Sequence, residues 1–195
     1  MKVIGFNGSP RKEGNTSIAI KTVFKVLEDE GIETEMVHIA EKPIYGCRAC
    51  GACKKTGDGF CIIDSDILND CVKKMYESDG IIIGSPVYFG SVTPQVKSLI
   101  DRSGYCSRAG GFLLKRKVGA GVIAARRQGA VETLHQINNL FLINQAIIPC
   151  SIYWNMGIGR EEGEIVNDKE GMDTFRVLGE NMAWLLKKVK SRDSK

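Results

Sequence analysis

The chain has 195 residues, of which 43% are hydrophobic and 26% charged, and its net charge is +4 at pH 7. This length suits one domain with a sizeable core and is short for two. The charge is mild and no block of Lys and Arg occurs, so we expect no nucleic-acid partner. No apolar run approaches the roughly 20 residues of a membrane-spanning helix, so no membrane partner is expected either.

The N-terminal residues MKVIGFNGS lead directly into an expected strand and leave no room for a signal peptide. We therefore expect a cytoplasmic protein, in a compartment where structural disulfides are rare. The cysteine count of seven agrees, because an odd number cannot pair completely within one chain.

Apolar runs bounded by turn residues alternate along the chain with segments of helical periodicity. Strands are expected at residues 2–6, 32–39, 80–86, 118–125 and 146–152. Helices are expected at residues 18–31, 64–78, 92–103, 130–143 and 173–190. This alternation predicts an α/β fold, a flavodoxin-like three-layer sandwich whose five-stranded parallel sheet has the order 2-1-3-4-5 and helices on both faces. We expect residues 1–195 to form a single domain.

Sheets of this order bind ligands beyond the carboxyl ends of their strands, at the point where strand order reverses. Here the loops after residues 6 and 84 flank that point. The first loop, GSPRKEGNTS (8–17), leads into a helix N-terminus, whose free N–H groups favour an anion. It offers a phosphate hydroxyls, an amide and a cation, from Ser9, Arg11, Asn15, Thr16 and Ser17. The alternative is an ordinary strand-to-helix turn with Asn15 or Thr16 as N-cap, but the position after the first strand favours phosphate binding.

The loop after the third strand, GSPVYFGSVTPQVKSLIDR (84–102), is the expected second wall of this site. Tyr88 and Phe89 can present aromatic faces, and Gly90 lets backbone groups approach a planar heterocycle. Taken alone, the two aromatic residues would be interpreted as core residues at the edge of the sheet.

Four of the seven cysteines lie in YGCRACGACKKTGDGFC (45–61), with the spacing C-x2-C-x2-C-x7-C. The overlapping C-x2-C steps are typical of cluster-binding runs in ferredoxins, whereas zinc sites more often use two separate pairs. Gly57 and Gly59 allow the last spacer to turn back toward the first three cysteines. A zinc site and an empty, reduced loop stay open as alternatives.

The remaining cysteines and both histidines are expected to be structural. Cys71 falls on an apolar helix face, Cys106 in a loop and Cys150 in a strand. His38 and His135 lie apart from other chemically active residues, and no Ser/His/Asp or paired-carboxylate pattern occurs. Residues 153–172 form a long, Gly-rich connection that we expect to act as a lid or an interface element.

The two loops together resemble the NADPH-dependent FMN reductase superfamily, through GSPRxxGNTS after the first strand and GSPVYFGxVxxQxKxLxDR after the third. With the cysteine segment inserted at about residues 44–63, the chain resembles the iron–sulfur flavoproteins of anaerobic microbes along nearly its whole length. The resemblance implies that the FMN phosphate is held by Ser9, Arg11, Asn15, Thr16 and Ser17. It implies an isoalloxazine site lined by Pro86, Val87, Tyr88, Phe89, Gly90, Ala125, Arg126 and Gly129. It implies one [4Fe–4S] cluster on Cys47, Cys50, Cys53 and Cys61.

The third loop departs from the family, which commonly has consecutive glycines where this chain has ARRQGA. Arg126 and Arg127 would favour an anionic flavin or substrate if they face the site, and would otherwise be solvated surface residues. Both interpretations stay open.

The resemblance implies a flavin-dependent oxidoreductase that passes electrons from ferredoxin through the cluster and FMN to a small-molecule acceptor. It also implies a homodimer or homotetramer. One alternative is a cluster-free reductase of FMN or quinones that takes hydride from NAD(P)H. Another is a flavodoxin-type electron carrier, which the positive net charge and the basic RRQG loop disfavour. In all three cases the cofactor carries the chemistry and the protein orients it.

Overall fold

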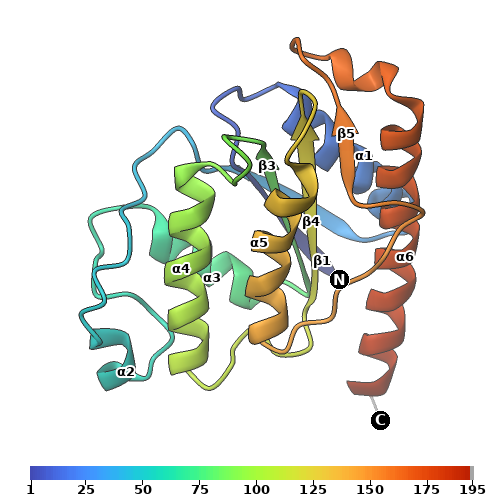
Figure 1. Ribbon diagram of the computed structural model, residues 1–195. Coiled ribbons are helices and arrows are strands. Elements are labelled where there is room, and N and C mark those ends of the chain that lie inside the picture. The colour runs from blue at the N-terminus through green and yellow to red at the C-terminus, as the bar shows by residue number, and fades with distance from the viewer. Residues whose placement is uncertain (194–195) are drawn as a thin grey trace.

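A parallel sheet of five strands, in the order β2-β1-β3-β4-β5, forms the centre of the molecule. The computed structural model describes residues 1–193 and is shown in Figure 1. The strands are β1 (Lys2–Asn7), β2 (Glu33–His38), β3 (Gly80–Pro86), β4 (Val118–Ala125) and β5 (Met156–Ile158). The helices are α1 (Asn15–Asp29), α2 (Ala52–Thr56), α3 (Leu68–Glu77), α4 (Pro94–Ala109), α5 (Ala130–Ile143), the 3-10 turn η1 (Glu164–Asn167) and α6 (Lys169–Asp193). The expected α/β fold and strand order are confirmed.

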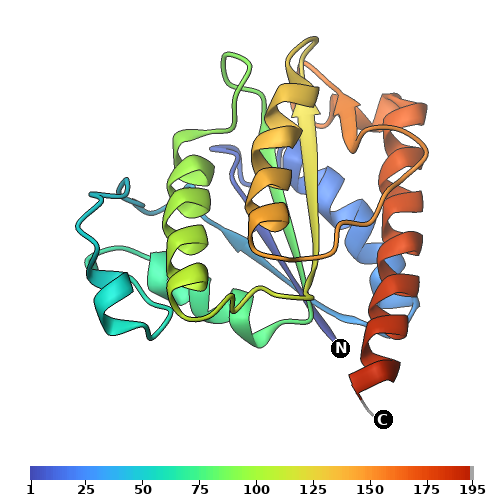
Figure 2. The ribbon, with the colours of Figure 1, turned by 60° about the horizontal axis from the view of Figure 1, so that its bottom comes forward.

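Helices cover both faces of the sheet because its central strands are apolar on both sides. Along β3, Ile81 and Ile83 pack into a core with α3, α4 and α5, while Ile82 packs into the core beneath α1 and α6. Each of these side chains is at most 1% exposed, so its burial contributes about 1.5–3 kcal/mol. Figures 1 and 2 show α4 and α5 on the opposite side of the sheet from α1 and α6.

The fifth strand differs from the expectation. Residues 146–152 make only one isolated bridge to the sheet, in which Ile147 pairs with Val118. Pro149 has no N–H to donate, so the chain cannot continue that pairing and leaves the sheet edge. It returns as β5, where Met156 pairs with Ile123 and Ile158 with Ala125. The segment 153–172, expected to be a long loop, therefore contains β5, η1 and the start of α6.

Two helix boundaries bear on function. The first helix begins at Asn15 rather than residue 18, which places the end of the phosphate-binding sequence within its first turn. The helix expected at 92–103 begins at Pro94, where proline fits a first turn, and continues to Ala109. It therefore includes Cys106, which was expected in a loop.

The cysteine segment lies between β2 and α3, and its short helix α2 packs against α4. Figure 1 shows it on the flank of the molecule, away from the edge at which β1, β3 and β4 end. None of the described helices combines the length and the apolar character needed to cross a bilayer.

Candidate functional site

The loop after β1 is held tightly between β3 and α4. The N–H of Gly8 donates to the carbonyl oxygen of Gly84 at 2.9 Å, and Thr93 Oγ1 donates to the carbonyl oxygen of Gly8 at 2.9 Å. A Cβ at position 8 would lie 2.1 Å from a methyl group of Val96, so only glycine allows this approach. The packing fixes the path of the chain as it turns toward α1.

Hydrogen bonds within the loop set its shape. The N–H of Ser9 donates to Asn7 Oδ1 at 3.0 Å, and the N–H of Arg11 donates to Ser9 Oγ at 3.1 Å. His38 Nε2 lies 2.6 Å from the carbonyl oxygen of Ser9, which anchors the loop to the end of β2. His38 is therefore structural here, as expected.

The N-terminus of α1 is open to a ligand. Gly14 is the N-cap and no side chain caps the helix, so the first N–H groups lack the usual side-chain acceptor. Thr16, in this first turn, is 1% exposed and its hydroxyl makes no hydrogen bond to another described residue. Free N–H groups and a free hydroxyl at a helix N-terminus suit a phosphate.

A cavity of about 200 Å³ opens beside this helix end, beyond the carboxyl ends of the strands. Of the expected cofactor-binding residues, those that line it are Ser9, Arg11, Asn15, Thr16, Pro86, Val87, Tyr88 and Arg126. The lining residues that were not expected are Pro10, Ala124, Gly159 and Arg160. Arginines from three loops thus surround one cavity, which favours an anionic ligand. Arg126 faces the cavity, whereas Arg127 is exposed and does not line it.

Two expected residues point away from this cavity because of their position on regular elements. Ser17 is buried, and its hydroxyl contacts Met36 Sδ on β2 at 3.9 Å. Ala125 is buried on the face of β4 opposite to that of Ala124, since successive side chains of a strand alternate. Its carbonyl oxygen instead accepts from the N–H of Gly159 at 2.9 Å.

The other three expected residues, Phe89, Gly90 and Gly129, belong to the loops after β3 and β4 but do not line the cavity. Phe89 is fully exposed at the tip of a turn, with a left-handed φ of 50°. Gly90 and Gly129 bring the loops after β3 and β4 together, since a Cβ on Gly129 would lie 3.0 Å from the Cα of Gly90. At a φ of 86°, Gly129 also adopts a conformation that side chains disfavour.

Asn15 lines the cavity, but its amide is engaged with the chain after β5. Asn15 Nδ2 donates to the carbonyl oxygens of Gly159 at 3.1 Å and Glu161 at 2.8 Å. This contact brings Arg160 to the cavity. Arg160 was not among the expected residues because the fifth strand was expected at 146–152. With β5 at 156–158, the rule that sites follow the carboxyl ends of strands points directly to residues 159–160.

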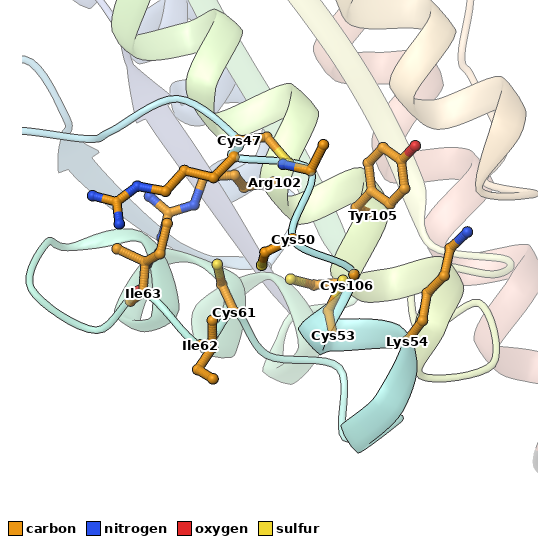
Figure 3. A pocket seen from close by; sticks show the side chains of 13 residues that line it. Cys47, Cys50, Cys53, Lys54, Cys61, Ile62, Ile63, Arg102, Tyr105 and Cys106 are labelled. Carbon is orange, nitrogen blue, oxygen red and sulfur yellow. Dashed lines mark hydrogen bonds between the residues drawn. The ribbon is translucent and has the colours of Figure 1, made fainter.

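The cysteine segment borders a second cavity, of about 110 Å³. Its lining includes the four cysteines of the motif, Cys47, Cys50, Cys53 and Cys61. Figure 3 shows that these side chains converge on the cavity from the segment before α2, from α2 itself and from the segment before α3. The volume is several times the roughly 10–15 Å³ that one water molecule needs.

Local backbone geometry turns the cysteines inward. Ala49 and Gly51 both have a left-handed φ, of 52° and 72°, so the chain reverses between successive cysteines. Cys61 is held by a reciprocal pair of hydrogen bonds with α3. Its N–H donates to Asn69 Oδ1 at 3.0 Å, and Asn69 Nδ2 donates to its carbonyl oxygen at 2.8 Å.

A fifth cysteine, Cys106, reaches the same cavity from α4 and is 1% exposed. Burial, together with the neighbouring Cys61 and Cys53, raises the pKa of its thiol to about 12, so it stays protonated at neutral pH. Cys71 lies in the apolar core, where burial raises its pKa to about 12. Cys150 is exposed and outside the sheet, contrary to the expectation of a strand.

Arg102 completes the lining of the cysteine cavity. Its guanidinium pairs with Asp66, and both groups are at most 1% exposed in their side chains. Although burial acts to lower the pKa of Arg102, the hydrogen bond to Asp66 and the neighbouring Cys61 hold it above its usual value. Burial likewise acts to raise the pKa of Asp66, but the hydrogen bond from Arg102 keeps it below its usual value. Both groups are therefore charged at neutral pH.

The thiols surround the cavity rather than meeting at one point. Within residues 1–193, no group of three or more His, Cys, Asp or Glu side chains has an arrangement that could hold a metal ion. In a four-iron cluster each thiolate bonds to a different iron, so the ligands stand apart around the cluster. Thiol donors around a cavity of this size fit such a group in chemistry and in room.

The sequence matches the family described as NADPH-dependent FMN reductase over residues 1–161. An iron–sulfur flavoprotein of Methanocaldococcus jannaschii is 43% identical, over 97% of this chain and 100% of the relative. An iron–sulfur flavoprotein of Methanosarcina thermophila is 35% identical, over 99% of this chain and 100% of the relative.

Solved structures show the same fold at low identity. The flavoenzyme NAD(P)H:(acceptor) oxidoreductase of Paracoccus denitrificans has a TM-score of 0.69 and 18% identity, over 96% of this chain and 97% of that one. A flavodoxin from the domain Archaea has a TM-score of 0.62 and 14% identity, over 97% and 99%. Together, the fold and these matches show that the chain belongs to the NADPH-dependent FMN reductase family and, within it, to the iron–sulfur flavoproteins, and that it is an FMN-dependent oxidoreductase.

Proposed function

We propose that this protein carries one [4Fe–4S] cluster on Cys47, Cys50, Cys53 and Cys61 and passes electrons from ferredoxin through it to FMN. From FMN the electrons go to a small-molecule acceptor. The observation that carries the proposal is the cavity of about 110 Å³ around which the four thiols of the motif gather, in a chain of the iron–sulfur flavoprotein family. When bound, FMN accepts or releases electrons singly or in pairs, and so links a one-electron donor to a two-electron acceptor.

The FMN site is proposed at the cavity of about 200 Å³ beside α1. The phosphate would take the free N–H groups of the helix, the Thr16 hydroxyl and the Arg11 guanidinium, each a donor to a charged acceptor. Pro86, Val87 and Tyr88 would flank the flavin ring, with Arg126 opposite. In this proposal five of the expected residues shape the surroundings of the FMN cavity and do not contact the cofactor within a single chain: Ser17, Phe89, Gly90, Ala125 and Gly129.

Arg48 and Lys54 line the cysteine cavity, and Lys55 follows Lys54 in α2. These three residues, the basic rim, would dock ferredoxin. All three side chains are exposed, and Lys54 Nζ lies 5.9 Å from the centre of the exposed Tyr105 ring. Exposed cations beside apolar side chains suit an acidic protein that must approach the cluster closely.

The two cavities are lined by different parts of the fold. The cysteine cavity lies beside α2, which is on the flank of the molecule (Figure 1), whereas the other is lined by residues at and after the carboxyl ends of β1, β3, β4 and β5. We infer a homodimer or homotetramer that brings the cluster of one subunit near the FMN of another. We further infer a single domain with the cysteine segment inserted at about residues 44–63, working in the reducing cytoplasm. The free state of all seven cysteines supports that location.

The test is protein prepared without oxygen and examined by absorption, by electron paramagnetic resonance and by iron and sulfide analysis. We expect about four irons and four sulfides per chain together with FMN. Serine at Cys47, Cys50, Cys53 or Cys61 should degrade the cluster but leave FMN bound. Serine at the exposed Cys150 is the matched control and should leave the iron content unchanged.

The same preparation tests the alternatives. Finding zinc in place of iron, or no metal in protein never exposed to air, would refute the proposal of an iron–sulfur cluster. Rapid reduction of FMN by NADPH but not by ferredoxin would then identify a cluster-free NAD(P)H-dependent reductase. Bound FMN that exchanges electrons with protein partners but reduces no small molecule would identify a flavodoxin-type carrier.

A further inference from the structure

Arg102 is a buried cation that joins both ends of the cysteine segment. It extends from α4 and is 1% exposed, although arginine is almost never fully buried unless it is paired. Arg102 Nη1 donates to the carbonyl oxygen of Tyr45 at 3.1 Å and pairs with Asp66 Oδ2. Arg102 Nη2 donates to the carbonyl oxygen of Ile63 at 2.9 Å. The same Asp66 accepts from the N–H of Tyr45 at 2.8 Å.

These partners have a defined place in the chain. Tyr45 comes two residues before Cys47, the first cysteine of the motif, and Ile63 comes two residues after Cys61, the last. A single guanidinium therefore links the residues just before and just after the cysteine motif, which together form the neck of the cysteine loop. The planar fork of arginine can hold several acceptors in fixed directions at once, which lysine cannot do.

Packing of the core does not require this arrangement. Replacing a buried ion pair by apolar residues of similar volume is often neutral or stabilising, so the pair is not explained by stability alone. Arg102 also lines the cysteine cavity and lies next to the Cys61 thiol, and its buried Nε has no hydrogen-bond partner within the described chain. Figure 3 shows Arg102 among the side chains around that cavity. A buried donor without a partner, beside a cysteine, points to a group that the cavity is built to receive.

We propose that Arg102 is a positioning residue for the cluster, which closes the cysteine loop around it and keeps a fixed positive charge beside Cys61. This inference rests on the proposed function, since it assumes that the cavity holds a cluster. Reduction adds negative charge to a cluster, and cluster potentials depend on nearby charge and on hydrogen bonds to the sulfurs. Arg102 lines the cysteine cavity whereas its partner Asp66 does not, so the cation lies nearer the cluster than the opposing charge and raises the reduction potential of the cluster.

The experiment compares three forms of the FMN- and cluster-loaded protein prepared without oxygen: wild type, R102M/D66N and R108M. The double variant removes both charges, so that no unpaired buried charge is left to unfold the chain. Arg108 lies on the same helix but is exposed, so R108M removes an arginine outside the neck and leaves the Arg102–Asp66 pair intact. We measure iron and sulfide per chain, FMN content, and the potentials of cluster and flavin separately.

We expect R102M/D66N to keep its FMN and its flavin potential, to lose part of its iron, and to show a lower cluster potential. R108M should match wild type. A cluster potential and iron content unchanged in the double variant would overturn the proposal. Loss of FMN together with iron would also overturn it, because Arg102 would then support the whole core.

A second measurement needs no cluster. In metal-free protein, trypsin should cleave the loop after Arg48, Lys54 or Lys55 faster in R102M/D66N than in wild type or R108M. Equal rates would overturn the role of Arg102 in closing the loop. If wild-type protein contains no cluster, the proposed function and the effect of Arg102 on the cluster potential are both refuted. The cleavage rates would still test whether Arg102 closes the cysteine loop.

Discussion

Replacing Thr16 by valine should weaken FMN binding strongly without unfolding the protein. Thr16 lies in the first turn of α1, lines the cavity beside the helix end and is 1% exposed. Valine keeps the shape of the side chain and removes only the hydroxyl. Because that hydroxyl makes no hydrogen bond to another described residue, the apoprotein loses no internal contact.

The size of the effect follows from the partner of the hydroxyl. A hydrogen bond to a charged acceptor, here the FMN phosphate, contributes about 1.5–3 kcal/mol. Since about 1.4 kcal/mol corresponds to a tenfold change in affinity, the Kd for FMN should rise roughly 10- to 150-fold.

Ser17 provides the matched control. It is the next residue, it carries the same functional group and it is equally buried, but its hydroxyl contacts Met36 Sδ instead of the cavity. Titrating FMN into the apoproteins, with quenching of flavin fluorescence as the readout, should give S17A a Kd close to that of wild type. Urea unfolding of the three apoproteins checks that each is folded.

Two results would refute the reasoning. If T16V binds FMN as tightly as wild type, the phosphate does not lie at the N-terminus of α1. If S17A weakens binding as much as T16V, the orientation of the first helical turn is wrong.

Three further predictions concern other contacts. Gly8→Ala should destabilise the protein by about 1–3 kcal/mol through its clash with Val96, lowering the Tm by roughly 2–12 °C in calorimetry; an unchanged Tm would contradict the close packing. Glu35 accepts hydrogen bonds from Lys2 and Lys74, which lower its pKa. Its contribution to the free energy of unfolding is therefore present at neutral pH and is lost as pH falls through the lowered pKa. The unfolding free energy of wild type should therefore drop more between about pH 5 and pH 3 than that of Glu35→Gln, and parallel urea-denaturation profiles would argue against this pairing. Reduction by ferredoxin should slow as salt rises, since attraction by the basic rim is screened over about 10 Å at 0.1 M; a rate independent of salt in stopped-flow measurements would exclude docking there.

The sequence by itself determined the sheet and its order. The segments that became β1, β3 and β4 are short apolar runs between turn residues, and such runs are buried on both faces wherever they lie in a parallel sheet. The residue types that indicate the chemistry of each site also lie close together in the sequence. Hydroxyls, an arginine and a helix start follow one strand, and four cysteines lie within one short segment.

The fifth strand could not be placed in this way. Residues 146–152 have the composition of a strand, whereas MGI at β5 is too short to show a pattern. Only the hydrogen bonds offered by the edge of β4, and the missing N–H of Pro149, decided which segment pairs there. Arg160 came to the FMN cavity as a consequence.

Tertiary structure also decided which side chains face each cavity. Thr16 and Ser17 are chemically alike, but neighbours on a helix point about 100° apart, so only one of them lines the cavity. Arg102 and Cys106 lie more than 40 positions beyond the cysteine motif in the chain and join it only because α4 packs against α2. Short sequence patterns thus indicate the type of chemistry at a site, whereas the packing of helices that are distant in sequence determines which residues surround that site.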